Sequence, residues 1–206
     1  MNYLAIGNSI TTHGVCSYWW SKIGMAASDV EHDYYHIVKK YIDSHYMGRN
    51  IIKCFNYYAW EVQGLDRDET FSLLDGVMDF SPKLITIQLG ENVSDVATYY
   101  DDFLSLIEHI KSCCPRSRVF IIGDFWYSEQ RGEIKKDIAI KTSSVYIDLK
   151  KLQLDKKYMC GLGTKVYGAD GRFHIVEHNG VAQHPNDYAM EYIAKKIISR
   201  IKLCGI

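Results

Sequence analysis

The stretch NYLAIGNSIT, residues 2–11, contains the pattern that decides the fold. A short apolar run over residues 2–7 ends at a glycine, and a serine follows two positions later. An apolar run without alternation predicts a strand that is buried on both faces, as strands of parallel sheets are. The glycine permits a sharp turn, so we expect Ser9 to lie just beyond the carboxyl end of this first strand.

Strand and helix patterns alternate along the rest of the chain. Apolar runs predict four more strands, at residues 50–57, 84–89, 118–123 and 144–149. Helical spacing predicts helices at residues 28–45, 99–113, 132–142 and 186–203. In the first and last of these, Val30 and Tyr188 are expected to face inward. The alternation predicts an α/β fold: a three-layer α/β/α sandwich around a flavodoxin-like, doubly wound, five-stranded parallel sheet.

Length and composition narrow the classes of protein. A chain of 206 residues without a linker or repeat predicts a single domain, residues 1–206. The net charge of −1 argues against a nucleic-acid partner, and no apolar run is long enough to predict a membrane partner. The first residues lack the basic segment of a signal peptide, so we expect a cytoplasmic protein with reduced thiols. The sequence does not predict an oligomeric state.

Residues 158–180 show weak periodicity and several glycines. A segment of this length without predicted structure is often functional in a compact domain.

Three polar residues stand where a parallel sheet places its ligands. Ligands bind beyond the carboxyl ends of the strands. Ser9 follows the first strand, Asn92 follows the third, and His184 stands before the last helix. A serine, an asparagine or a histidine alone is weak evidence. Because these positions converge in a doubly wound sheet, together they predict a site in which His184 activates Ser9.

Three short motifs resemble those of the SGNH/GDSL hydrolase family. They are GNSI at residues 7–10, GEN at residues 90–92 and HP at residues 184–185. The chain also resembles a subgroup of that family through GMAAS at residues 24–28. The resemblance extends from the first strand to the last helix. It implies carboxylic ester hydrolysis or acyl transfer, with Ser9 as nucleophile and His184 as base.

The family's oxyanion hole, by the same resemblance, is formed by the backbone N–H groups of Ser9 and Glu61 and the side-chain amide of Asn92. Glu61 stands where the family usually has a glycine, and Val181 stands where it usually has the acid that orients the histidine. A backbone carbonyl or a carboxylate from elsewhere is therefore expected to orient His184. The candidate carboxylates are Glu61, Glu91 and Glu177.

The expected substrate is a carbohydrate or other small molecule that carries a small acyl ester such as acetyl. We expect Asn8, His13, Trp60 and Trp126 to contact it, and Asp124 to meet its hydroxyl groups. No cofactor is expected, and the cysteine and histidine spacings predict no metal site.

Two alternatives share the predicted site: a sugar O-acyltransferase and a catalytically weak carbohydrate-binding homologue. In a third, a flavodoxin-like binding protein, Ser9, Thr11 and Thr12 would cradle a phosphate.

Overall fold

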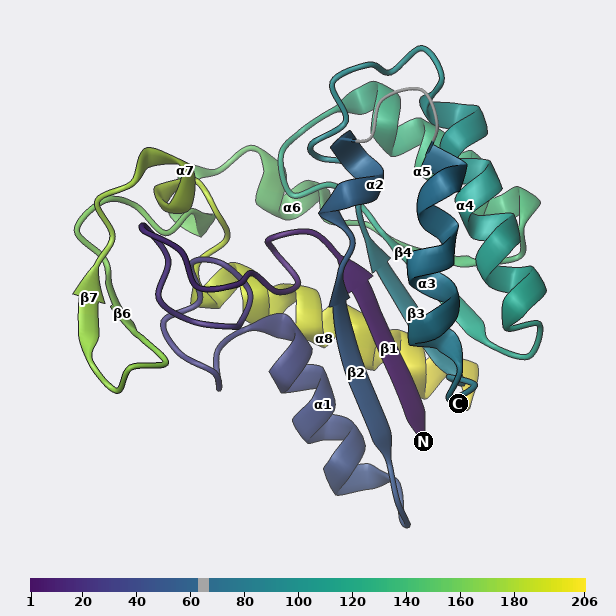
Figure 1. Cartoon of the computed structure of the whole chain (residues 1–206), viewed down its shortest axis with the longest axis horizontal. Coiled ribbons are helices and arrows are strands. Elements are labelled where there is room, and N and C mark those ends of the chain that lie inside the picture. The colour runs from purple at the N-terminus through teal and green to yellow at the C-terminus, as the bar shows by residue number, and fades with distance from the viewer. Residues whose placement is uncertain (63–66) are drawn as a thin grey trace.

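A five-stranded parallel sheet forms the centre of the protein (Figure 1). The computed structural model describes residues 1–62 and 67–206. The strand order is β2-β1-β3-β4-β5. The strands are β1 (Asn2–Gly7), β2 (Ile51–Asn56), β3 (Leu84–Gln88), β4 (Arg118–Ile122) and β5 (Val145–Ile147). The predicted three-layer fold is thereby confirmed, although the last strand is shorter than expected.

The interior strands alternate their side chains between two apolar layers. In β1, Tyr3 and Ala5 face one layer, whereas Leu4 and Ile6 face the other, and all four side chains are fully buried. This is why the sequence of β1 is continuously apolar: both faces of the sheet are covered.

Helices from distant parts of the chain cover each face. The first layer is formed with α1 (Tyr34–His45), α6 (Lys150–Gln153) and α8 (Asp187–Cys204). The second is formed with α2 (Tyr58–Val62), α3 (Phe71–Met78), α4 (Tyr99–Cys113) and α5 (Glu129–Lys141). Short 3-10 helices lie at η1 (Arg67–Thr70) and η2 (Lys156–Tyr158). No helix of the described residues is long and apolar enough to cross a membrane.

Two expectations about the helices are wrong. The first helix begins at Tyr34 rather than at residue 28, and Val30 lies outside it with 48% of its surface exposed. The cause is Asp33, whose buried side chain caps the helix by accepting the backbone N–H of His36. Tyr188, expected to face inward, is 76% exposed in the first turn of α8.

The weakly periodic segment forms a structured lobe with the chain that follows β1. It contains the hairpin β6 (Lys165–Tyr167) and β7 (Phe173–Ile175) and the short helix α7 (Asn179–Ala182). Figure 1 shows these elements beside the dark purple segment after β1. A third apolar cluster joins the two, with Trp19 and Met25 against Val166 and Val181. This lobe lies over the region beyond the carboxyl ends of the strands.

Candidate active site

The turn after β1 places Ser9. Gly7 is required by close packing: a Cβ atom there would lie 1.9 Å from Thr11 Oγ1 and 2.8 Å from the backbone oxygen of Gln88. The side-chain oxygen of Asn8 then accepts the backbone N–H of Ile10 at 3.0 Å, which closes the turn around Ser9. Among the described residues, no group accepts the backbone N–H of Ser9. That N–H is therefore available to a ligand.

The Ser9 hydroxyl and the His184 imidazole are in hydrogen-bond contact. Ser9 Oγ lies 2.8 Å from His184 Nε2, and His184 Nδ1 lies 2.7 Å from the backbone oxygen of Gly180. Gly180 belongs to α7, so the helical turn just before His184 supplies this acceptor. A carbonyl can only accept, so Nδ1 carries the proton and Nε2 presents its lone pair to Ser9.

Burial favours the neutral form of the histidine. It lowers the pKa of His184 to about 4, and the hydrogen bond to Gly180 offsets only part of that effect. The Trp126 ring packs edge-on against the imidazole at 5.0 Å between centroids. Its indole N–H donates to the backbone oxygen of Gln183 at 3.2 Å, which holds the ring in place. His184 is thus a neutral base with a fixed ring.

A cavity of about 330 Å³ opens onto the Ser9–His184 pair. Tyr18 and His178 stack at 4.3 Å on one side of it, and Tyr58 and Asn56 contribute another part of the wall. Its full lining is Ser9, His13, Tyr18, Met25, Asn56, Tyr58, His178, Gly180, Val181 and His184. Of the four predicted substrate contacts, His13 lines this cavity.

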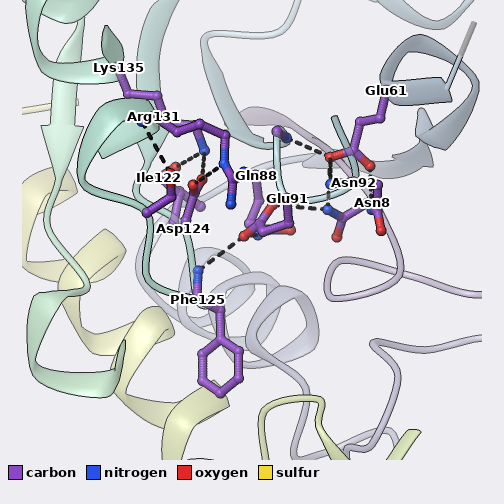
Figure 2. A network of polar contacts seen from close by, with 12 residues as sticks. Asn8, Glu61, Gln88, Glu91, Asn92, Ile122, Asp124, Phe125, Arg131 and Lys135 are labelled. Carbon is purple, nitrogen blue, oxygen red and sulfur yellow. Dashed lines mark hydrogen bonds and ion pairs between the residues drawn. The ribbon is translucent and has the colours of Figure 1, made fainter. Parts of the chain in front are cut away.

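A carboxylate network holds the side chain of Asn8, the residue before Ser9 (Figure 2). The buried Glu61 carboxylate accepts hydrogen bonds from three residues that the sequence separates. These are Asn8 Nδ2 at 3.2 Å, Gly90 N at 2.5 Å and, from Asn92, Nδ2 at 2.7 Å and the backbone N at 3.3 Å. Glu61 therefore fixes the Asn92 side chain relative to the Ser9 turn.

The network continues through Glu91 to a buried ion cluster. Glu91 accepts hydrogen bonds from Asn8 Nδ2 at 3.0 Å and Phe125 N at 3.1 Å, and from the amide of Gln88. Beyond Phe125, Asp124 pairs with Lys135 at 2.5 Å and with Arg131 at 2.7 Å. Asp124 and Lys135 are almost completely buried, and the ion pair between them offsets the free-energy cost of removing each charge from water.

Several predicted roles are contradicted. Trp60 is fully buried and packs against Phe103 at 5.8 Å, so it forms core rather than a substrate wall. Asn8 is fully buried, with its side chain used by the network. Asp124 has 1% of its surface exposed and is ion-paired with Arg131 and Lys135 inside the protein. Trp126 is not among the residues that line the cavity, but it is partly exposed and packs against His184, so its contact with the substrate stays a prediction.

None of the candidate acids orients His184. Glu61 and Glu91 bind the groups of the buried network, and Glu177 is exposed on the lobe. The Gly180 carbonyl takes that place, which was the alternative to an acid. The Glu61 carboxylate also takes part in the site by accepting the hydrogen bond from Asn92, whereas the resemblance implied a role for the Glu61 backbone N–H only.

The turn after β1 is not built to cradle a phosphate. The backbone N–H groups of Thr11 and Thr12 already donate to the Asn8 carbonyl, at 3.0 and 3.1 Å. The Thr11 hydroxyl is buried against Tyr34 OH at 2.6 Å. With these donors occupied, the flavodoxin-like binding alternative loses its anion site.

The contacts that the sequence did not predict join residues from different elements of the chain. Tyr18 and His178 meet only because the lobe folds over the sheet, and Lys135 reaches Asp124 from the interior face of α5. No local spacing marks these pairs. One weak signal lies in α5, where Lys135 shares the buried side of the helix with Ile138 and Ala139, since a lysine at an inward position requires a buried acid.

The partly buried Glu91 predicts an unusual dependence of stability on pH. Burial, followed by the nearby negative charge of Asp124, raises the pKa of Glu91 to about 7. Between its ordinary pKa of 4.5 and about 7, the folded state keeps a proton that the unfolded state has released. The contribution of Glu91 to the free energy of unfolding therefore falls as pH rises through that range, by at most about 1.4 kcal/mol per pH unit.

The measurement is urea unfolding of Glu91→Gln and wild type between about pH 5 and pH 7. We expect the free energy of unfolding of the variant to rise more steeply with pH, because the opposing term is gone. Glu177→Gln, which changes an exposed carboxylate, is the control and should follow the wild type. Parallel pH profiles for Glu91→Gln and wild type would contradict the assignment.

Solved structures resemble this protein over nearly the whole chain. A variant of the acetyl xylan esterase Axe2 from Geobacillus stearothermophilus matches with a TM-score of 0.59 at 18% identity, over 97% of this chain and 94% of that chain. A protein assigned as a GDSL-like lipase from Parabacteroides merdae matches with a TM-score of 0.62 at 13% identity, over 96% and 94%. No protein-family model and no curated protein matches the sequence.

A third structure is a two-domain esterase active on acetylated mannans. Its TM-score is 0.61 at 12% identity, over 99% of this chain and 50% of that chain, so this protein spans about half of it. These likenesses show that the chain has the fold of the SGNH/GDSL hydrolases. That fold agrees with the family resemblance of the motifs around Ser9, Asn92 and His184.

Proposed function

We propose that this protein is a serine esterase that removes a small acyl group, such as acetyl, from a carbohydrate, with residues 1–206 acting as one domain. The observation that carries the proposal is the contact of 2.8 Å between Ser9 Oγ and His184 Nε2 at the cavity. A serine hydroxyl is a weak nucleophile near neutral pH, and an adjacent neutral histidine is what activates it.

The reaction follows from this geometry. Ser9 Oγ attacks the ester carbonyl carbon while His184 Nε2 takes the hydroxyl proton. The tetrahedral intermediate collapses, and the same proton passes to the leaving alcohol, which leaves an acyl-serine. Water, deprotonated by His184, then attacks the acyl-serine. The acid is released and Ser9 regains its proton.

The developing oxyanion needs donors that are already in position. The backbone N–H of Ser9 is free to donate, and the Asn92 amide is held by Glu61 with one of its two N–H bonds still available. We assign the oxyanion hole to these two groups. Glu61 acts through its carboxylate and positions Asn92.

The cavity supports a small acyl group on a sugar. Its volume of about 330 Å³ is at the lower end of ligand sites, which favours a short acyl group over a long one. Tyr18 and Tyr58 offer partly exposed rings for sugar faces, and Asn56 and His13 offer polar groups for hydroxyls. Structural neighbours act on acetyl xylan and on acetylated mannans, which is the same chemistry.

The test compares p-nitrophenyl esters of increasing chain length with acetylated xylo- and manno-oligosaccharides. We expect acetate release from the oligosaccharides, and rates on the p-nitrophenyl esters that fall as the acyl chain grows. A fluorophosphonate should label Ser9, identified by mass spectrometry of the peptide. Oligosaccharide binding without acetate release or labelling would instead support the catalytically weak homologue. A preference for long acyl chains would overturn the substrate class.

The lowered pKa of His184 predicts that the protein stays active at low pH. A base works only when deprotonated, and the pKa of His184 is lowered to about 4. We therefore expect kcat/KM to stay constant as pH falls from neutral and to decline only below about pH 5. Histidine NMR of the folded protein, with His184→Gln to assign the signal, should give the same pKa. A decline centred near 6.5 in both measurements would contradict the prediction.

A further inference from the structure

Three metal-binding side chains meet on the outer face of α3 and α4, away from the Ser9 cavity. Asp75 comes from α3, and His109 and Cys113 come from α4, one turn apart. Their donor atoms all lie within 4.8 Å of one another. Because residues four apart on a helix share a face, the backbone alone directs the histidine and the thiol to the same point.

The separations are close to those of a tetrahedral zinc site. His109 Nε2 lies 2.8 Å from Asp75 Oδ1, and Cys113 Sγ lies 3.7 Å from both atoms. Zinc bonds of about 2.3 Å to sulfur and about 2.0–2.1 Å to nitrogen and oxygen place tetrahedral donors roughly 3.3–3.6 Å apart. Shifts of a few tenths of an ångström would bring all three side chains into that geometry.

The histidine ring is held for this role. Phe71 stacks on it at 4.3 Å with an interplanar angle of 22°, so His109 keeps Nε2 turned toward Asp75. His109 is partly buried, whereas Asp75 is 54% exposed and Cys113 is exposed. An ion bound here would have three protein ligands and an open side toward water.

We propose that Asp75, His109 and Cys113 bind a thiophilic divalent cation, with Zn²⁺ as the first choice. On binding, the Cys113 thiol releases its proton to water, His109 changes to the neutral tautomer that carries its proton on Nδ1, and the Asp75–His109 hydrogen bond is replaced by two bonds to the metal. α4 runs from the carboxyl end of β3 to the amino end of β4, so Cys113 lies at the end of the sheet opposite Ser9. The ion ties α3 to α4 and takes no part in ester hydrolysis.

The sequence predicts no metal site here because these ligands form no sequence motif. His109 and Cys113 have a spacing that many solvated helices contain, and Asp75 lies 34 residues before His109. Only the packing of α3 on α4 joins them.

Cobalt substitution tests the site directly. We expect the metal-free protein to bind one Co²⁺ with a thiolate-to-cobalt absorption band in the near ultraviolet, and Zn²⁺ to displace it and raise the melting temperature. Cys113→Ser should abolish the band. His109→Ala and Asp75→Asn should weaken binding at least about 10–100-fold, since even outer-shell changes cost that much. Ester hydrolysis should be the same with and without zinc.

Cys204→Ser is the control, because it removes a different thiol, which is partly buried, and leaves all three ligands in place. It should keep the band and the affinity. Absence of the thiolate band in the wild type, or its persistence in Cys113→Ser, would overturn the proposal. Cobalt bound without the band would indicate binding by histidines alone, which also overturns it.

Discussion

Replacing Ser9 with alanine is expected to lower kcat for acetyl-ester hydrolysis by about 10³-fold or more. The hydroxyl is the only group at the cavity that His184 Nε2 contacts among the described residues, so its loss removes the nucleophile. His184→Ala should cost a similar factor. Because the two side chains act as a unit, Ser9→Ala/His184→Ala should be no slower than either single variant. Steady-state and single-turnover hydrolysis of p-nitrophenyl acetate measure these rates.

Loss of the fold must be separated from loss of the reaction. Within residues 1–62 and 67–206, Ser9 Oγ has one hydrogen bond, so Ser9→Ala should change the free energy of unfolding by no more than about 1 kcal/mol. Ser94→Ala removes an exposed hydroxyl from the loop after β3 and is the matched control. Full activity in Ser9→Ala, or additive losses in the double variant, would reject the Ser9–His184 mechanism.

The parallel sheet could be predicted because its sequence signal is local and strong. A strand buried on both faces is mostly apolar, as residues 3–6 of β1 and Leu84, Ile85 and Ile87 of β3 are. Helix starts were harder to predict, because a cap depends on tertiary contacts. Asp33 caps α1 by accepting the backbone N–H of His36, and it also accepts that of Gly24 at 3.1 Å, a contact that leaves no periodic signal in the sequence. Short elements such as α7 and the β6–β7 hairpin carry too few residues for a periodic pattern.

The residues of the candidate site also divide into those that a local sequence signal marks and those that only tertiary contacts bring together. Ser9 and His184 could be predicted because each follows or precedes a strong element and its position is set by the topology. The Gly180 carbonyl that orients His184 leaves no side-chain signal, since any residue carries a carbonyl. The role of Glu61 depends on contacts with residues up to 53 positions away, which a single sequence does not show.

Replacing Glu61 with glutamine is expected to lower kcat by about 10²–10³-fold with little change in KM. The carboxylate accepts Gly90 N with one oxygen and Asn92 Nδ2 with the other. A glutamine must keep its oxygen toward Gly90, because that backbone N–H is buried and needs an acceptor. Its amide then faces the amide of Asn92, and two donors cannot pair. Asn92 is expected to turn over and present its oxygen, which removes the donor from the oxyanion hole.

Glu61→Ala separates positioning from stability. It leaves the donors of Asn8, Gly90 and Asn92 without the acceptor, so we expect a loss of about 1–3 kcal/mol for each group that water does not reach, in addition to the loss of kcat. Glu69→Gln, an exposed carboxylate near α3, is the control for charge and should retain both properties. Chemical denaturation and pre-steady-state acylation rates are the measurements. If Glu61→Gln acylates at the wild-type rate, Asn92 needs no anchor, and Glu61 serves only to join the turn after β1 to the loop after β3.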